Sequence, residues 1–395
     1  MTPLWSSEVE RSVREHACSL DEQHRPDSVQ QCVRCVITNQ RPRITFDSEG
    51  VCSACRFMEH QRTEIDWAAR DAELRKLTDL YRSGGKYDCI VPCSGGKDST
   101  AVAWTLKHEY GMHPLCIKFG PFLYTDIGHR NYDAFNLSGF DCMEFRPNGL
   151  IHRKLARLAF EYLGDPFQPF VYGQLAYPMH MAQKFNISLV FGAENGEAHY
   201  GGDASANDKP RWDYADWERV YLKGAGVGRL VDLGLQLGAI TDDERRSLSP
   251  FYTVPHFEPN GCFTPQYHWL SYYRLHHPQS NFYLASEKCG FHSNEERSEG
   301  TYSKYASLDD RLDGFHYFLS FVKFGLGRAT SDAAHEIRDG DRDKDEALAL
   351  VKRFDGEFPK RYYEEFKGYL GIDDEQFWRV VERFRAPHVA LKVAA

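Results

Sequence analysis

Short apolar segments alternate with amphipathic ones between residues 84 and 202, and this alternation constrains the fold more than any other feature. Four apolar runs have the length of strands: 87–93, 114–119, 140–145 and 188–194. Three further segments have helical spacing: 97–111, 150–163 and 173–185. A polar connection is expected between the second and third strands. Buried strands separated by helices pair in parallel through right-handed crossovers. The sequence therefore predicts an α/β fold with a doubly wound parallel sheet.

The first predicted strand runs into a glycine loop, SGGKDS (94–99), which opens the first helix. Backbone N–H groups at such a helix N-terminus bind phosphate oxygens, and glycines let the chain approach the anion closely. Lys97 supplies a positive charge, and the hydroxyls of Ser94 and Ser99 can donate hydrogen bonds. Asp98 can hold a magnesium ion. The spacing is neither GxxxxGK[ST] nor GxGxxG. The loop is a candidate phosphate cradle, and the alternative is a Gly-Gly turn with incidental polar residues.

Two Cys-x2-Cys pairs lie near the N-terminus, with sixteen residues between them. The four cysteines are Cys32, Cys35, Cys52 and Cys55. This spacing is typical of a structural zinc site. Four thiolates complete a tetrahedron around zinc, so the metal would stabilise a segment that is too short for its own core. Iron is compatible with the same ligands, and four unligated thiols are the other interpretation.

Charge and hydropathy limit the classes of function. The net charge is −9, from 48 basic and 57 acidic residues, which argues against a broad basic surface for nucleic acid. No apolar stretch approaches the roughly 18 residues of a membrane span. The N-terminus carries charges where a signal peptide has an apolar region. We therefore expect a cytoplasmic protein that binds neither nucleic acid nor membrane.

Changes in composition along the chain predict five parts. A helical pattern at 64–82 leads into the α/β domain, and another lies at 343–354 in the C-terminal region. The parts are an N-terminal arm (1–30), a four-cysteine zinc knuckle (31–60), an α/β nucleotide-binding domain (61–202), an irregular aromatic-rich substrate region (203–300) and a mainly helical C-terminal region (301–395). The aromatic side chains of the fourth part either hold a sugar or form a satellite core.

At SGGKDS the chain resembles the PP-loop ATP pyrophosphatase superfamily, which carries SGGxDS after its first strand. The resemblance implies a sheet of the adenine-nucleotide alpha-hydrolase type. It also implies that ATP is cleaved between its α and β phosphates, that the substrate is adenylated, and that the loop holds the departing pyrophosphate. GMP synthetase, asparagine synthetase and several tRNA-modifying enzymes share this module, so the substrate stays open. The implied ATP-binding residues are Ser94, Gly95, Gly96, Lys97, Asp98, Ser99, Phe119 and Asn195.

Longer segments resemble the N-acetyl sugar amidotransferase family of bacterial surface-polysaccharide (O-antigen, lipopolysaccharide) biosynthesis, from about Cys32 to Phe384. They are TDIGHRN (125–131), GDPFQPFVYGQLAYP (164–178), FGAENGEAHYGG (191–202), TYSKYASLDDRLDGFHYFL (301–319) and KFGLGRATSDAAHEIRDG (323–340). The family pattern is closer to EYGG where this chain has HYGG, so a role for an acid at His199 does not transfer.

The family resemblance implies that an acetamido group on a sugar becomes an acetamidino group. The amide oxygen would attack the α phosphate of ATP, and ammonia would then replace AMP. Lys97, magnesium at Asp98 and the loop amides would stabilise the pyrophosphate. Glu194 and Glu197 are candidate general bases, because ligands of open α/β sheets bind beyond the carboxyl ends of the strands; either glutamate could instead be an ordinary loop carboxylate. Candidate substrate residues are Tyr200, Gly201, Gly202, Lys304, Arg328 and Arg338, and a salt-bridged helix surface is the alternative for the charged ones.

The source of ammonia is expected to be another protein. The sequence has no nucleophile elbow with a cysteine, and its earliest cysteine is Cys18. The resemblance implies a partner pair similar to the glutamine amidotransferase and cyclase subunits of histidine biosynthesis. The expected substrate is a nucleotide-linked sugar acid, either a diacetamido uronic acid or a nine-carbon nonulosonic acid. A tRNA thiolation enzyme, which needs a third reactive cysteine and an RNA-binding surface, and a nucleotide-binding scaffold are the alternatives.

Overall fold

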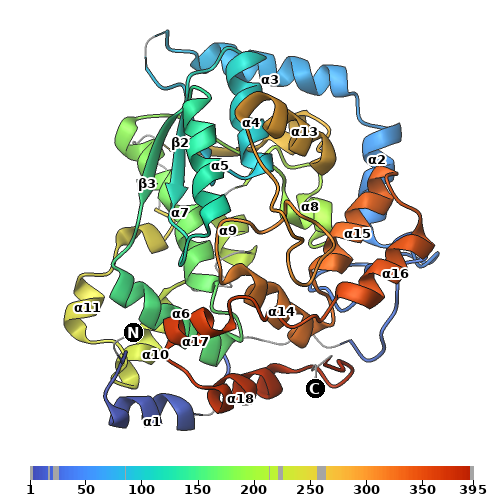
Figure 1. Cartoon of the computed structure of the whole chain (residues 1–395). Coiled ribbons are helices and arrows are strands. Elements are labelled where there is room, and N and C mark those ends of the chain that lie inside the picture. The colour runs from blue at the N-terminus through green and yellow to red at the C-terminus, as the bar shows by residue number, and fades with distance from the viewer. Residues whose placement is uncertain are drawn as a thin grey trace.

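A computed structural model describes residues 3–16, 18–20, 26–84, 86–212, 214–220, 226–255 and 264–391. Its centre is a six-stranded sheet with the strand order β3-β2-β1-β4-β6-β5. Figure 1 shows two of its parallel strands, β2 and β3, side by side. The strands are β1 (Cys89–Pro92), β2 (Pro114–Phe119), β3 (Asp141–Phe145), β4 (Leu189–Gly192), β5 (Arg211–Trp212) and β6 (Gln266–Trp269). Five of them are parallel, and only the short edge strand β5 is antiparallel to its neighbour.

Helices cover both faces of the sheet, as the alternation of β1 side chains shows. Ile90 packs in one buried cluster with residues of α6 (Gly149–Leu163) and α7 (Gln168–Phe185). Its neighbour Val91 packs in a second cluster with residues of α3 (Trp67–Tyr81) and α4 (Lys97–His108). Because successive side chains of a strand point to opposite faces, the apolar run at 87–93 serves two cores at once. The predicted α/β class is confirmed.

Each predicted strand and helix of the first half is present, but the connection between β2 and β3 differs from the prediction. This segment contains a helix, α5 (Asp126–Leu137), which Thr125 caps by accepting a hydrogen bond from the Gly128 N–H. The buried residues of α5 are few and include Ile127 and Phe135. The pattern was therefore too polar to reveal a helix that buries only a narrow stripe.

The sheet also continues past residue 202, into a region that we expected to be irregular. β6 pairs in parallel with β4, and β5 closes the edge beside β6. The indole rings of Trp212, Trp217 and Trp269 pack edge to face or tilted against one another, and all three belong to the core cluster on the α6 and α7 side. Part of the aromatic content of this region is therefore core. Strands of two to four residues show too little alternation to be recognised.

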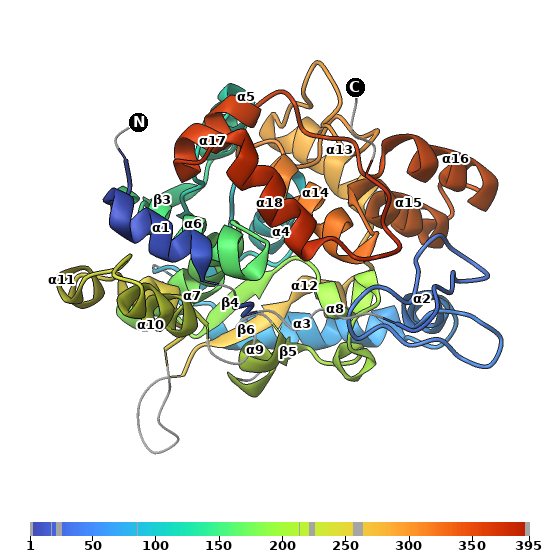
Figure 2. The same cartoon turned by 90° about the horizontal axis from the view of Figure 1, so that it is seen from below.

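The C-terminal region is helical, as predicted, and packs on the other parts of the chain. The ring of Phe160 in α6 lies against the rings of Phe366 and Phe377. Figure 2 shows α15 and α16 beside α2, at the end of the molecule that holds the knuckle. The helices outside the first half of the sheet are α1 (Ser7–Glu15), α2 (Ser53–Thr63), α8 (Gly196–Tyr200), α9 (Tyr214–Val220), α10 (Gly228–Gln236), α11 (Asp242–Arg246), α12 (Leu270–Tyr273), α13 (Pro278–Cys289), α14 (Asp313–Phe324), α15 (Arg328–Asp339), α16 (Lys344–Phe354), α17 (Tyr363–Leu370) and α18 (Asp374–Phe384).

Within the described ranges, no helix combines the length and the apolar character that a membrane crossing requires.

Candidate active site

The strand order places a crevice between the carboxyl ends of β1 and β4. From β1 the chain moves outward through β2 to β3, and it then returns to place β4 on the other side of β1. Such a reversal leaves the loops of the two central strands on opposite sides of a gap, where open α/β sheets bind their ligands. A cavity of about 550 Å³ lies there, and Lys97, Asp98 and Glu194 line it. The loop after β1 and the loop after β4 therefore both form part of the cavity wall.

The glycine loop has the backbone geometry of an anion site. Gly95 has a φ of +82°, and a Cβ atom at that position would lie 2.8 Å from the Tyr132 Cα. A side chain at residue 95 would be both strained and obstructed. Gly96 is the N-cap of α4, and among the described residues no side chain caps this helix. The N-terminus of α4 thus offers N–H groups and the positive end of the helix dipole to the cavity.

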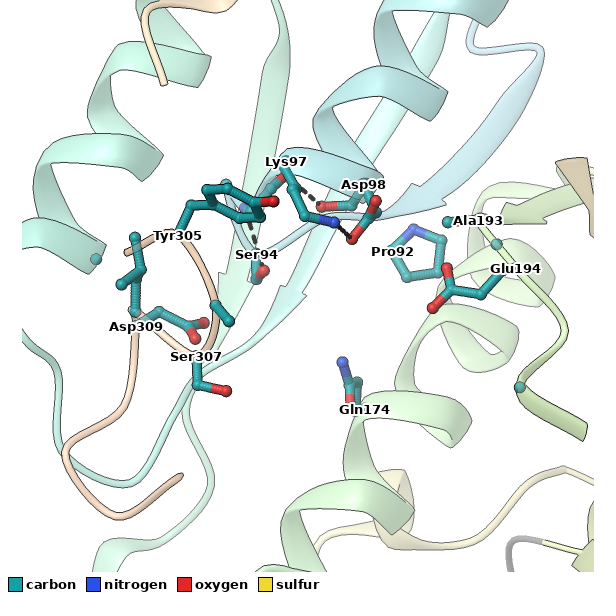
Figure 3. A pocket seen from close by; sticks show the side chains of 18 of the residues that line it. Pro92, Ser94, Lys97, Asp98, Gln174, Ala193, Glu194, Tyr305, Ser307 and Asp309 are labelled. Atoms are coloured by element: carbon teal, nitrogen blue, oxygen red, sulfur yellow. Dashed lines mark hydrogen bonds and ion pairs between the residues drawn. The ribbon is translucent and has the colours of Figure 1, made fainter. Parts of the chain in front are cut away.

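Lys97 and Asp98 form an ion pair on the wall of the cavity (Figure 3). The distance from Lys97 Nζ to Asp98 Oδ2 is 2.5 Å, and Asn281 Nδ2 in α13 donates to Asp98 Oδ1 at 2.9 Å. Burial alone would raise the pKa of Asp98, but the charges of Lys97 and His276 and the hydrogen bonds from Lys97 and Asn281 lower it to about 2. Asp98 is therefore an ionised carboxylate at neutral pH, as a magnesium ligand must be.

Glu194 directly follows β4 and lines the same cavity (Figure 3). Burial and the negative charge of Asp98 raise its pKa to about 7, against the opposing effect of Lys97. A carboxyl group with this pKa can take or give a proton near neutral pH. The two carboxyl groups in this cavity thus have different pKa values, because Asp98 forms an ion pair with Lys97.

The C-terminal region supplies a further wall. Arg328, the first residue of α15, lines the cavity; its Nε donates to Asp332 Oδ1 at 2.9 Å, and an Nη1–H donates to the Tyr317 hydroxyl. Tyr200, at the end of α8, lines the same cavity. Ser307 is also in the wall and has a φ of +56°, which is unusual for a residue other than glycine. A cation, two phenols and a strained loop thus face the two carboxylates.

Several predicted site residues lie outside the wall of this cavity. Glu197 is 6% exposed, and both of its carboxylate oxygens accept hydrogen bonds from Arg43, at 2.7 and 2.8 Å. Asn195 is the N-cap of α8 and also donates to the Ala206 carbonyl. Gly202 packs against the Glu197 carboxylate, and Gly201 against the side chains of Ala54 and Ile44. These residues build the turn that presents Tyr200.

The two remaining predicted cations also point elsewhere. Lys304 is exposed and donates to the Glu295 carbonyl. Arg338 is 6% exposed and donates to the His199 carbonyl at 2.9 Å, while its Nη1 lies 4.0 Å from Cys35 Sγ. Of the predicted charged substrate residues, Arg328 is the one that reaches the cavity.

Other lining residues were assigned no role from the sequence. Gln174, Tyr305, Ser307, Asp309 and Tyr317 line the cavity. All five lie in two of the segments that resemble the N-acetyl sugar amidotransferase family, 164–178 and 301–319. The resemblance of these segments is the sequence signal that could have identified them. Helical or loop spacing alone does not say which residues of such a segment face inward.

A second cavity of about 290 Å³ adjoins the first and shares Ser94, Ser99 and Gln174 with it. Phe119, at the end of β2, lines this second cavity together with Phe170. The aromatic rings give it an apolar wall of the kind that holds a flat heterocycle.

A buried lysine lies in the wall of the second cavity. Lys118 is 2% exposed, its Nζ donates to the Ser94 carbonyl at 3.0 Å, and it lies 4.4 Å from the centre of the Tyr124 ring. Burial lowers the pKa of this ammonium group. Lys118 therefore holds the backbone of Ser94, the first residue of the glycine loop.

The four cysteines of the two pairs come together and are buried. Cys32 Sγ is 3.9 Å from Cys55 Sγ, and Cys35 Sγ is 3.7 Å from Cys52 Sγ. Sulfurs bound to one tetrahedral zinc at 2.3 Å are about 3.8 Å apart. The N–H groups of Cys35 and Cys52 lie 3.5 and 3.3 Å from Cys32 Sγ and donate to it, as expected for a thiolate ligand. The site fits a structural zinc ion.

Two comparisons with known proteins bear on this chain. Residues 299–392 match a family described as LPS biosynthesis protein WbpG-like, C-terminal domain. A stretch of 88 residues, or 22% of this chain, is 32% identical to the uncharacterised protein MJ1599 of Methanocaldococcus jannaschii. The chain covers 31% of the length of that relative. The family match spans α14 to α18, the region that contributes Tyr317 and Arg328 to the cavity, and it supports a kinship with lipopolysaccharide biosynthesis proteins.

Proposed function

We propose that this protein is an ATP-dependent amidotransferase of lipopolysaccharide biosynthesis, with a PP-loop nucleotide site. It would convert the acetamido group of a nucleotide-linked sugar acid into an acetamidino group. One observation carries the proposal: the cavity between β1 and β4 brings together a glycine loop at a helix N-terminus, a carboxyl group whose pKa is raised to about 7 and an arginine from the WbpG-like region.

The nucleotide would lie across the two adjoining cavities. The N–H groups of the loop and Lys97 suit the β and γ phosphates, and the apolar wall formed by Phe119 suits the adenine ring. Ser94 and Ser99 line both cavities, so they would lie beside the α phosphate. Magnesium bound at Asp98 would supply positive charge to the phosphates. Lys97 would then exchange its ion pair with Asp98 for contacts to the departing pyrophosphate.

The chemistry assigned to the sugar needs two displacements. The amide oxygen would bond to the α phosphorus of ATP while the bond to pyrophosphate breaks. Ammonia would then add to the imidate carbon, and AMP would leave with the former amide oxygen. The nitrogen adduct must lose a proton, and Glu194 is the base that we assign because its carboxylate lines the cavity and titrates near neutrality. Glu197 is the weaker candidate, since Arg43 occupies both of its oxygens.

Arg328 and Tyr200 are assigned to the acidic part of the substrate. A guanidinium group suits a carboxylate or diphosphate because it presents several donors in one plane. Asp332 and Tyr317 hold the Arg328 side chain in place. The donor of ammonia would be a partner pair of a glutamine amidotransferase and a cyclase-like subunit, as the family resemblance implies. The reaction would take place in the cytoplasm, where ATP is available.

The test uses the purified protein with ATP, an ammonium salt and a panel of nucleotide-linked diacetamido sugars. We expect AMP and pyrophosphate in equal amounts, together with a sugar product whose mass has fallen by the difference between oxygen and NH. Uronic and nonulosonic acids in the panel identify the sugar class. The same assay with tRNA and a sulfur donor tests thiolation, the second candidate; AMP release only in that reaction would overturn the proposal.

A further inference from the structure

A third cavity, of about 170 Å³, adjoins the main cavity and shares Asp98 and Ala193 with it. Its other lining residues come from α4, from the segment 270–276 that contains α12, and from the first two turns of α13. The third cavity therefore meets the main cavity at the residue assigned to magnesium and at the residue that directly precedes Glu194.

The lining residues from α4 show that the third cavity is elongated. They lie on one face of the helix, since they follow one another at intervals of one, three or four positions: Asp98, Ala101, Val102, Thr105 and Glu109. The eleven steps from the first to the last span about 16 Å. Pockets for drug-sized ligands have volumes of about 300 to 1,000 Å³. A cavity of this volume and length is a narrow passage, too small for a second sugar or nucleotide.

The passage reaches solvent at the end away from the main cavity. Glu109, Leu275 and Ser280 line it and are exposed. Arg274 also lines this end, and its Nη1 donates to the Glu109 carboxylate. Val102, in contrast, is 3% exposed. The passage therefore leads from an exposed rim, past buried side chains, to the edge of the main cavity.

The wall of the passage suits a small neutral molecule. Val102, Leu270 and Leu284 contribute apolar side chains. An ion that leaves water for such surroundings loses far more free energy of hydration than a neutral molecule does. His276 lines the passage and is 7% exposed, and its burial lowers its pKa to about 4. Its imidazole is thus neutral at neutral pH and can exchange hydrogen bonds with a solute without adding a charge.

The reaction assigned to the main cavity needs a third reactant after the first two are bound. ATP would fill the space at the glycine loop, and the sugar acid would lie towards Arg328. Ammonia must still reach the imidate carbon between them. A molecule that leaves the passage enters the main cavity beside Ala193, next to Glu194, the base assigned to the nitrogen adduct.

We propose that the passage between α4 and α13 is the entry route for ammonia, an inference that rests on the amidotransferase function proposed above. An ammonium ion releases its proton to solvent at the exposed rim. Neutral ammonia then moves along α4 and reaches the imidate carbon from the side of Asp98 and Ala193. No covalent bond to nitrogen other than this N–H bond changes before the addition itself.

The experiment narrows the passage from its two sides in the full-length protein. Ala101→Phe extends a ring into it from α4, and Ser280→Trp covers it from α13. AMP formation is measured against ammonium concentration, with ATP and the sugar saturating. We expect the KM for ammonium to rise about tenfold and the KM for ATP to stay unchanged, because only the access of one reactant is altered. Ser280 is exposed, so Ser280→Trp tests the route even where Ala101→Phe fails to fold.

Exchange of labelled pyrophosphate into ATP, with the sugar present and ammonium absent, reports adenylation alone and should be normal in both variants. Glu287→Trp is the matched control, since Glu287 is an exposed residue two turns further along α13 that lines none of the three cavities. It should keep the KM for ammonium of the unsubstituted chain.

Normal exchange with an unchanged KM for ammonium in Ala101→Phe and Ser280→Trp overturns the entry route and leaves the proposed function standing. Loss of exchange in both variants also overturns the route, because the substitutions then act on the adenylation site. Absence of exchange in the unsubstituted chain with every sugar of the panel overturns the proposed function, and the route with it.

Discussion

Glu194 couples the stability of the folded chain to pH, and its replacement by glutamine should stabilise the chain in alkaline solution only. The folded chain holds the pKa of Glu194 at about 7, whereas an unfolded chain has a glutamate pKa of about 4.3. A raised acid pKa means that the fold favours the protonated form. The stabilisation from this preference is complete below about pH 4 and is lost as the pH rises through about 7.

The magnitude follows from the difference between the two pKa values. A difference of about 2.7 units corresponds to about 3.7 kcal/mol at 1.36 kcal/mol per unit, which is an upper bound. Glu194 is partly exposed, so solvent screening reduces this to about 1 to 3 kcal/mol. Glutamine stays neutral at every pH. Glu194→Gln should therefore match the unsubstituted chain near pH 4 and exceed its free energy of unfolding by about 1 to 3 kcal/mol near pH 9.

The assay is denaturant unfolding at a series of pH values, with Glu15→Gln as the control because Glu15 is exposed at the end of α1. The Glu15 variant should follow the unsubstituted chain throughout. Glu194→Gln should also abolish amidination. In the unsubstituted chain, kcat/KM should rise through about pH 7, because the pH profile of kcat/KM reports ionisations of the free enzyme. A stability gain for Glu194→Gln that is equal at pH 4 and pH 9, or larger at pH 4, would refute the reasoning.

Three further predictions concern the glycine loop, the adjoining cavity and the knuckle. Asp98→Asn should abolish AMP formation and leave the zinc content unchanged, because it removes the proposed magnesium ligand and none of the four cysteines; AMP assays and elemental analysis check both. Gly173→Ala should raise the KM for ATP and destabilise the fold by about 1 to 3 kcal/mol, because the added Cβ would overlap the Phe119 ring. Gly368→Ala in α17, where nothing lies within 4 Å of the added Cβ, is its control and should be neutral or stabilising in thermal unfolding. Cys35→Ser should release zinc and lower the melting temperature, and an unchanged zinc content would contradict the four-cysteine assignment.

The strands around the loop could be predicted from the sequence because they are buried on both faces and read as continuous apolar runs. The segment at α5 could not, since a helix that buries one narrow stripe looks like a polar connection. β6 could not either, because its place beside β4 depends on a pairing between residues that are more than seventy positions apart. Local spacing carries no information about such a pairing.

The same limit applies to the site. The sequence places Glu194 and Glu197 equally well after β4, and only the fold shows that Arg43, from the knuckle segment, occupies Glu197 and leaves Glu194 at the cavity. Arg328 and Arg338 lie on one helix, but ten residues correspond to nearly three turns. The first faces the cavity and the second lies beside the cysteines.

This arrangement of α15 gives the knuckle a role in the geometry of the cavity. Near the C-terminal end of α15, the Arg338 side chain contacts both Cys35 Sγ and the His199 carbonyl. His199 directly precedes Tyr200, which lines the cavity. At its N-terminal end, Arg328 faces the same cavity. A zinc ion that holds the knuckle rigid would thus hold α15 at one end while the other end meets the substrate. Stability and substrate affinity should therefore fall together when zinc is removed, whereas a knuckle that only stabilised its own segment would leave substrate affinity unchanged.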